Sequence, residues 1–318
     1  MLRHAALAAA LLLSIPFLSP DSARAEAPLV KKQAPGFYRA MVGDIEVTAL
    51  LDGTAKLPMG QFLSGAPKEQ VAAALGRHFL EDTHEVSVTA YLVNTGGKLV
   101  LIDTGSGGYF GDAPLLVDNL RAAGYRPEQV DEVCITHMHG DHIGGLMTGT
   151  ARTFPNARLR IDKADTDYWL SDEMMAKAGE QAPAFKVAME KVRPYAAAGR
   201  LATFEGVTQI APGVTAVPTH GHTPGHAIYR IESKGQTLVL WGDLMHVASV
   251  QFEAPRIAIS FDTDSPRAIA EREKAFAEAA QKRWMVGAAH ISFPGLGRIR
   301  AEGNGYAFEP LNYSILKN

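Results

Sequence analysis

The sequence predicts a mixed α/β fold, because short apolar runs typical of buried strands alternate with segments of helical periodicity. Residues 130–136, 214–218 and 237–241 consist largely of apolar and β-branched residues and are too short for helices. Residues 68–79 and 266–281 carry the apolar spacing of helices. With 318 residues, 47% of them hydrophobic, the chain can bury a large core as one sizeable domain or two small ones.

The remaining elements follow from local pattern and turn residues. In chain order we expect a strand or hairpin over residues 38–52, a loop covering a pocket at 57–65, the helix 68–79, strands 86–94 and 98–103 joined by a hairpin turn, a helix 113–123, strands 130–136 and 158–162, a helical region 164–195 broken near 179–183, strands 214–218 and 237–241, the helix 266–281 capped by Ser265, a strand 284–288 and a terminal strand near 305–313.

Composition limits the function classes. The formal net charge of −3 argues against a nucleic-acid binder, which would carry a basic surface. The single cysteine, Cys134, allows no intrachain disulfide and is expected to be a buried apolar residue.

The N-terminus predicts export. Arg3 precedes an apolar run at residues 5–18, and Ala23-Arg24-Ala25 offers a small-x-small cleavage site. We therefore expect residues 1–25 to be a cleaved signal peptide and residues 26–318 to be a periplasmic or secreted domain without a stable membrane anchor. An uncleaved anchor is the alternative, but the apolar run is short and contains Pro16.

One stretch carries a dense set of metal-ligand residue types. His137, His139, Asp141 and His142 follow the predicted strand 130–136 and lie where a loop leads into a helix. Neutral imidazole and carboxylate together suit zinc and similar divalent metals. A surface loop rich in histidine by chance is the alternative.

His-x-His-x-Asp-His after a strand resembles the signature of the metallo-β-lactamase superfamily. The resemblance implies an αββα four-layer sandwich with a one- or two-metal site at the edge of the sheets. Gly221-His222-Thr223-Pro224-Gly225-His226 is similar to that family's third-ligand motif, in which His222 binds metal and His226 orients or packs.

The same resemblance implies the full ligand set. Asp243 and His290, each after a predicted strand, would be the metal-bridging aspartate and the last ligand, and Asp103 would support the site, unless it only caps a turn. The first metal would be held by His137, His139 and His222, the second by Asp141, His142 and His290, and Asp243 would bridge the two metals.

A narrower resemblance, over residues 34–313, is to methyl parathion hydrolases and their lactonase relatives. Its carrying stretches are residues 34–38, 135–139, 292–295 and 299–303. It implies a two-metal hydrolase, often a homodimer, whose pocket would be lined by Phe110, Trp169 and Phe185.

The pocket departs from the organophosphate hydrolases of that group. His246 replaces an aliphatic residue, Ile259 and Phe261 differ in shape, and no Arg accompanies Phe62. These departures favour a lactone or aryl ester as the small-molecule substrate. A phosphotriesterase, a glyoxalase II-like thioesterase and a metal-dependent binding protein without turnover are the alternatives.

The expected chemistry is hydrolysis by a hydroxide bridging two divalent ions per chain, with zinc preferred over manganese, iron or cobalt. Two residues are expected to assist beyond the ligand set. Asp141 would also transfer a proton, and His246 would donate a hydrogen bond to the substrate carbonyl or its oxyanion.

Overall fold

The computed structural model describes residues 27–110 and 114–316. Residues from Pro35 onward form one compact unit, which contains all the helices and strands of the described residues. The described residues before it, 27–34, belong to a separate unit. The expected signal peptide at residues 1–25 lies outside the described residues.

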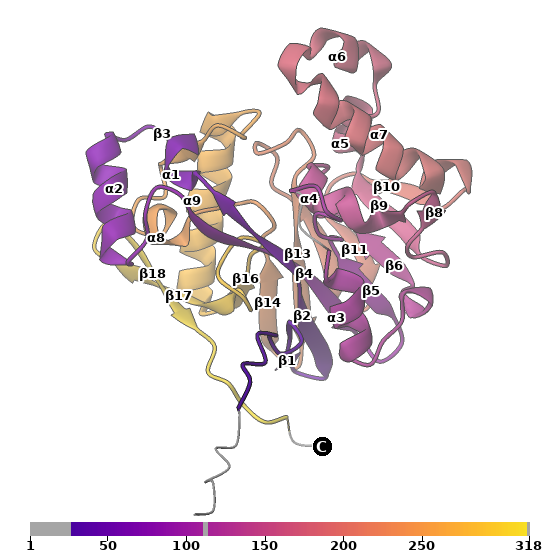
Figure 1. Ribbon diagram of the computed structural model, residues 1–318, viewed down its shortest axis with the longest axis horizontal. Helices are drawn as coiled ribbons and strands as arrows, with labels where there is room; N and C mark the ends of the chain where they lie inside the picture. Colours follow the sequence, from indigo (N-terminus) through magenta and orange to yellow (C-terminus); the bar gives the residue numbers. More distant parts are fainter. Residues whose placement is uncertain (1–26, 111–113, 317–318) are drawn as a thin grey trace, which may run out of the picture. The chain divides into compact units, whose positions relative to one another are not determined.

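Two seven-stranded sheets form the centre of the unit (Figure 1). The first sheet has the order β1 (Phe37–Val42), β2 (Ile45–Leu57), β4 (His84–Asn94), β5 (Leu99–Ile102), β6 (Glu132–Cys134), β9 (Arg158–Asp162), β10 (Leu201–Phe204). The second has the order β11 (Thr208–Ala211), β12 (Val214–Pro218), β13 (Ala227–Ser233), β14 (Gln236–Leu240), β16 (Met285–Gly287), β17 (Leu296–Glu302), β18 (Gly305–Pro310). Two small ladders pair β3 (Leu63–Ser64) with β15 (Ala258–Ile259) and β7 (Met147–Thr148) with β8 (Ala151–Arg152).

Helices cover the outer faces and one end of the sheets. They are α1 (Met59–Phe62), α2 (Lys68–Arg77), α3 (Leu116–Ala122), α4 (Gly140–Ile143), α5 (Lys163–Trp169), α6 (Asp172–Lys177), α7 (Ala182–Ala197), α8 (Ala248–Gln251) and α9 (Ser265–Lys282), with 3-10 turns at Pro127–Gln129, Gly144–Leu146 and Gly179–Gln181.

Three apolar cores separate four layers. The inner core joins the sheets, with Val93 and Ile102 of the first packed in one cluster with Tyr229 and Leu240 of the second. A second core joins the first sheet to α3 and α7, and a third joins the second sheet to α9 through Phe276. The order is helix, sheet, sheet, helix, so the expected αββα sandwich is confirmed.

The structure corrects several expected elements. The expected loop at 57–65 contains the short helix α1 and strand β3, and the strand expected at 130–136 is only Glu132–Cys134. The helical region 164–195 breaks near residue 170 as well as near Gly179. The N-cap of α9 is Asp264, whose side chain accepts from the Arg267 N–H, and not Ser265. Cys134 is fully buried, as expected.

Within the residues described, no helix combines the length and the apolar character needed to cross a bilayer.

Candidate metal centre and active site

Four side chains converge from three loops of the two sheets to form a first cluster. His137 and His139 follow β6, His222 follows β12, and Asp243 follows β14. His139 Nδ1 lies 3.0 Å from His137 Nε2 and 3.1 Å from His222 Nε2. Nitrogens that share a tetrahedral zinc at 2.0–2.1 Å lie about 3.3 Å apart, so this spacing fits one ion.

A second cluster lies beside the first and contains Asp141, His142, Asp243 and His290. His290 Nε2 lies 3.3 Å from Asp141 Oδ2 and 3.1 Å from Asp243 Oδ1, and His142 Nε2 lies 3.1 Å from Asp243 Oδ1. Every residue that the sequence predicted as a ligand therefore falls in one of the two clusters.

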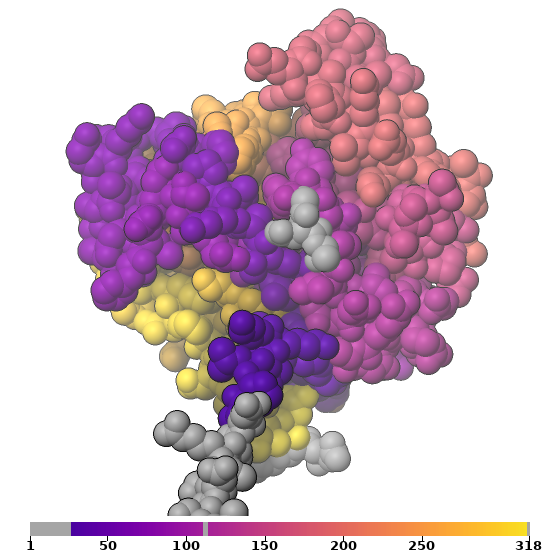
Figure 2. Space-filling model, in the orientation of Figure 1, coloured from indigo at the N-terminus to yellow at the C-terminus, as the bar shows by residue number. Residues whose placement is uncertain are grey.

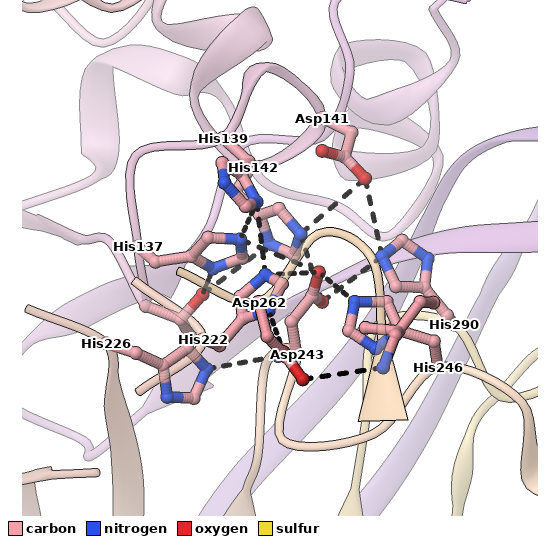
Figure 3. A network of polar contacts seen from close by, with 12 residues as sticks. His137, His139, Asp141, His142, His222, His226, Asp243, His246, Asp262 and His290 are labelled. Carbon is pink, nitrogen blue, oxygen red and sulfur yellow. Dashed lines mark hydrogen bonds and ion pairs between the residues drawn. The ribbon is translucent and has the colours of Figure 1, made fainter. Parts of the chain in front are cut away.

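Asp243 is common to both clusters and lies between them in Figure 3. Its Oδ2 lies 3.5 Å from His137 Nε2 and 3.4 Å from His222 Nε2, whereas its Oδ1 faces His142 and His290. Gly242 allows this approach, because its φ of +54° suits glycine and a Cβ there would lie 2.7 Å from Thr136 Cβ. One carboxylate thus presents one oxygen to each cluster.

The donor atoms fit divalent cations. Within the described part of the chain, His142 Nε2 and Asp243 Oδ1 are buried and face each other in the second cluster at 3.1 Å, but neither makes a hydrogen bond. Burial, with the neighbouring His222, lowers the pKa of His139 to about 3, which leaves the neutral ring that a metal needs. Burial opposes ionisation of Asp243, but the surrounding imidazoles hold the pKa of this carboxyl well below its usual range. Burial also opposes ionisation of His290, but Asp243 and Asp141 raise its pKa to about 10, and the same two carboxylates hold the pKa of His142 well above its usual value. In the absence of a cation these rings hold protons beside the carboxylates, and a divalent cation would displace those protons.

The outer ring nitrogens of three of these histidines have oxygen partners. His142 Nδ1 lies 2.8 Å from Asp103 Oδ2, His222 Nδ1 lies 2.9 Å from Asp262 Oδ1, and His290 Nδ1 lies 2.9 Å from the Ser87 carbonyl oxygen. Because ionised carboxylates and carbonyls only accept, each Nδ1 carries the proton and each Nε2 keeps its lone pair for a metal.

Asp103 does more than cap a turn. Its carboxylate accepts the backbone N–H of Thr136 at 2.7 Å and the Thr136 hydroxyl at 2.8 Å, besides facing His142. The residue is buried and has a φ of +60°, a conformation that Asp tolerates better than most residues. It therefore ties the end of β5 to the loop that carries the first ligands.

His226 has both ring nitrogens engaged outside the clusters. The Asp243 N–H donates to His226 Nε2 at 3.2 Å, so Nδ1 is protonated and lies 2.9 Å from Thr219 Oγ1. His226 thus orients the backbone of Asp243, the role that the sequence suggested.

A cavity of about 620 Å³ opens over the two clusters. Residues of β2, α1 and β4 form one wall, and residues from α5 to α7 form the opposite one, which Figure 2 shows as the purple and pink masses. Of the aromatic residues expected here, Phe110, Trp169 and Phe261 line the cavity. Phe185 does not: it is fully buried behind Trp169, with ring centroids 4.7 Å apart.

His246 belongs to the cavity wall and stands beside the clusters. Its Nε2 lies 3.0 Å from Asp243 Oδ2, and its ring stacks on His290 with centroids 5.6 Å apart. Its Nδ1 has no hydrogen-bond partner among the described residues. Burial lowers the pKa of His246, so the ring is neutral at pH 7.

Sequence reasoning missed two buried aspartates. Asp262 follows Phe261, which was placed at the pocket, but its partner His222 lies 40 positions away in the sequence. Asp165 accepts backbone N–H groups from two of the ligand-bearing loops, at Met138 and Gly225, and nothing in the sequence marks it.

Comparison with known proteins agrees with this geometry. The model of the metallo-β-lactamase superfamily matches residues 85–290. The hydrolase AbOPH of the β-lactamase superfamily superposes with a TM-score of 0.84 at 34% identity, over 89% of this chain and 100% of that one. AidC, a dizinc quorum-quenching lactonase, superposes with a TM-score of 0.79 at 26% identity, over 88% of this chain and 99% of that one.

A curated N-acyl homoserine lactonase from Bacillus cereus is 27% identical over 48% of this chain and 61% of its own length. The first curated relatives are likewise spanned over less than two thirds of their length, 60% and 56%. The family match nevertheless extends from β4 to the last ligand, His290, and includes every residue of the two clusters. This chain therefore belongs to the metallo-β-lactamase superfamily.

Proposed function

We propose that this protein is a hydrolase that uses two divalent ions to cleave neutral lactones or aryl esters. The observation that carries the proposal is the position of Asp243, with one carboxylate oxygen toward each ligand cluster. Two ions held in this way would supply an activated water and stabilise the charge that develops on the substrate oxygen.

The residues of the chain would divide the work. The two clusters bind the ions, and Asp141, at the cavity floor, is placed to accept or deliver a proton. His246 is neutral and lines the cavity, so its N–H could donate to a lactone or ester carbonyl. A neutral ring has a single N–H, so donation to the substrate would replace the present contact of Nε2 with Asp243 Oδ2 or require the proton on Nδ1.

The cavity favours an uncharged substrate. Its wall on β2, α1 and β4 is apolar, with Leu57, Met59 and Val88 among the lining residues. No Lys or Arg is among the described lining residues, whereas Glu180 and Asp262 are. Apart from the proposed ions, none of these side chains would neutralise an anionic substrate, such as a β-lactam carboxylate or the glutathione part of a thioester.

The relatives support the same choice. AidC is described with a bound product, N-hexanoyl-L-homoserine, and the Bacillus cereus relative is an N-acyl homoserine lactonase. Both act on, or hold the product of, a neutral lactone. We extend the substrate class to aryl esters because Phe110, Trp169 and Phe261 give the pocket aromatic walls.

The proposal is tested on purified protein reconstituted with zinc or with manganese. Elemental analysis should find close to two ions per chain, because seven ligands are too many for one tetrahedral site. A hydrolysis panel of lactones, aryl esters, phosphotriesters, thioesters and β-lactams should show the highest kcat/KM on the first two.

Asp243→Asn should lose ions and activity together, with the exposed change Asp118→Asn as its control. One ion or fewer per wild-type chain, or a fully active Asp243→Asn enzyme, would contradict the dinuclear assignment. A panel led by phosphotriesters or thioesters would replace the substrate class.

We further propose that the enzyme acts outside the cytoplasm, after removal of residues 1–25. The support is the sequence alone: a basic start, an apolar run and the Ala23-Arg24-Ala25 site.

A further inference from the structure

Asp165 is a fully buried carboxylate in the first turn of α5, away from both ligand clusters. Its Oδ2 accepts the backbone N–H of Met138 at 2.8 Å, and its Oδ1 accepts the backbone N–H of Gly225 at 2.6 Å. Met138 lies between the ligands His137 and His139. The Asp165 side chain therefore connects the loop that bears His137 and His139 to the loop that bears His222. These are all the residues of the first cluster except Asp243.

The start of α5 is packed closely against the second of these loops. A Cβ on Gly225 would lie 2.4 Å from the Asp165 backbone nitrogen, so only glycine permits this approach. Asp162, the N-cap of α5, lies with its Oδ2 3.1 Å from His220 Nε2. Three contacts thus hold the loop of residues 219–226 to the same helix end.

A carboxylate suits this position because it has two acceptor oxygens, but its burial disfavours the ionised form. Among the described residues, no Lys, Arg or His nitrogen lies within ion-pair distance of Asp165, and burial raises its pKa to about 6. An asparagine of the same shape could accept only one of the two N–H groups, because its amide nitrogen would face the other donor.

We propose that Asp165 is a positioning residue that holds the loops bearing His137, His139 and His222 at their mutual distance. It would touch neither metal nor substrate and would act through Met138 and Gly225. The inference rests on the proposed function, because it assumes that these histidines bind metal.

The test compares Asp165→Asn with Asp167→Asn, a change on the same helix at an exposed residue that pairs with Lys163. In the metal-free proteins, hydrogen exchange should be at least about tenfold faster at the Met138 and Gly225 amides in Asp165→Asn. Competition with a chromophoric chelator should show an affinity for zinc that is about 10- to 100-fold lower, the usual cost of losing an outer partner. The control should match the wild type in both measurements.

The activity of Asp165→Asn should return largely toward the wild-type value when zinc is raised to saturation, because every ligand is still present. Asp165→Ser, which has one acceptor and less bulk, should show the same pattern. Unchanged exchange and zinc affinity in both variants would overturn the proposal, as would variants that cannot be obtained folded with or without zinc, since Asp165 would then serve the fold as a whole.

Failure of the proposed function gives a different result. If the wild-type protein bound no metal, the proposed function would be wrong, and Asp165 would have no metal ligands to position. The exchange rates of the Met138 and Gly225 amides would still show whether Asp165 holds the two loops.

Discussion

Asp262 and His222 form a buried pair in which the carboxylate oxygen Oδ1 lies 2.9 Å from Nδ1. The contact fixes the ring tautomer and turns Nε2 toward His139 Nδ1, 3.1 Å away. The Thr263 N–H also donates to the His222 carbonyl oxygen, so the segment of residues 259–263 holds this histidine by backbone and side chain together.

Asp262→Asn should lower the affinity for metal about 10- to 100-fold, because the amide keeps an acceptor but loses the charge that makes the imidazole a better ligand. Metal affinity is measured by chelator competition, with the exposed Asp118→Asn as control. Equal affinities in the two variants would show that the pair only packs.

His246→Leu should lower kcat/KM for lactones or aryl esters by up to about 100-fold, as expected on loss of one donor to the developing oxyanion. Phosphotriester turnover should stay level or rise, because an aliphatic side chain widens the apolar wall. The metal content should not change, and the exposed His78→Leu serves as control. A proportional fall on both substrate classes, or no change on either, would separate His246 from substrate preference.

The stability of the metal-free protein should depend on pH through Asp165. Burial raises its pKa to about 6, whereas an unfolded chain ionises this group near 4. Between about pH 4 and pH 6 the folded state binds the extra proton, so the contribution of Asp165 to the free energy of unfolding falls as the pH rises, by about 3 kcal/mol in all.

Denaturant titrations at pH 4 and pH 7 check this prediction. Asp165→Asn lacks the group, so the wild type should lose stability relative to this variant across that interval. A constant difference between the two proteins would show that folding does not raise the pKa of this carboxyl.

Export predicts a mature N-terminus at or near Glu26. Mass spectrometry of the protein from its native host provides the measurement, and an intact Met1 segment there would contradict the signal-peptide interpretation.

The ligands were predictable from sequence because each one lies in a local signature at the end of a strand. Asp262 and Asp165 were not, since their partners lie 40 and 27 positions away in sequence and only tertiary packing brings them together. Phe185 was misplaced because helical spacing identifies an apolar face but does not say whether that face meets a pocket or the core. The cap of α9 was misassigned between adjacent residues, both of which can cap a helix.

The cavity walls and the ligands come from different stretches of the chain. The ligands follow β6, β12, β14 and β16, whereas apolar and aromatic wall residues such as Leu57, Val88 and Trp169 belong to β2, β4 and α5. Substitutions in these walls can therefore accumulate without altering any of the seven residues that we expect to bind metal. A protein built in this way can come to cleave substrates with different leaving groups while it keeps the same hydrolytic chemistry. Directed evolution toward new substrates should therefore begin in β2, α1 and β4.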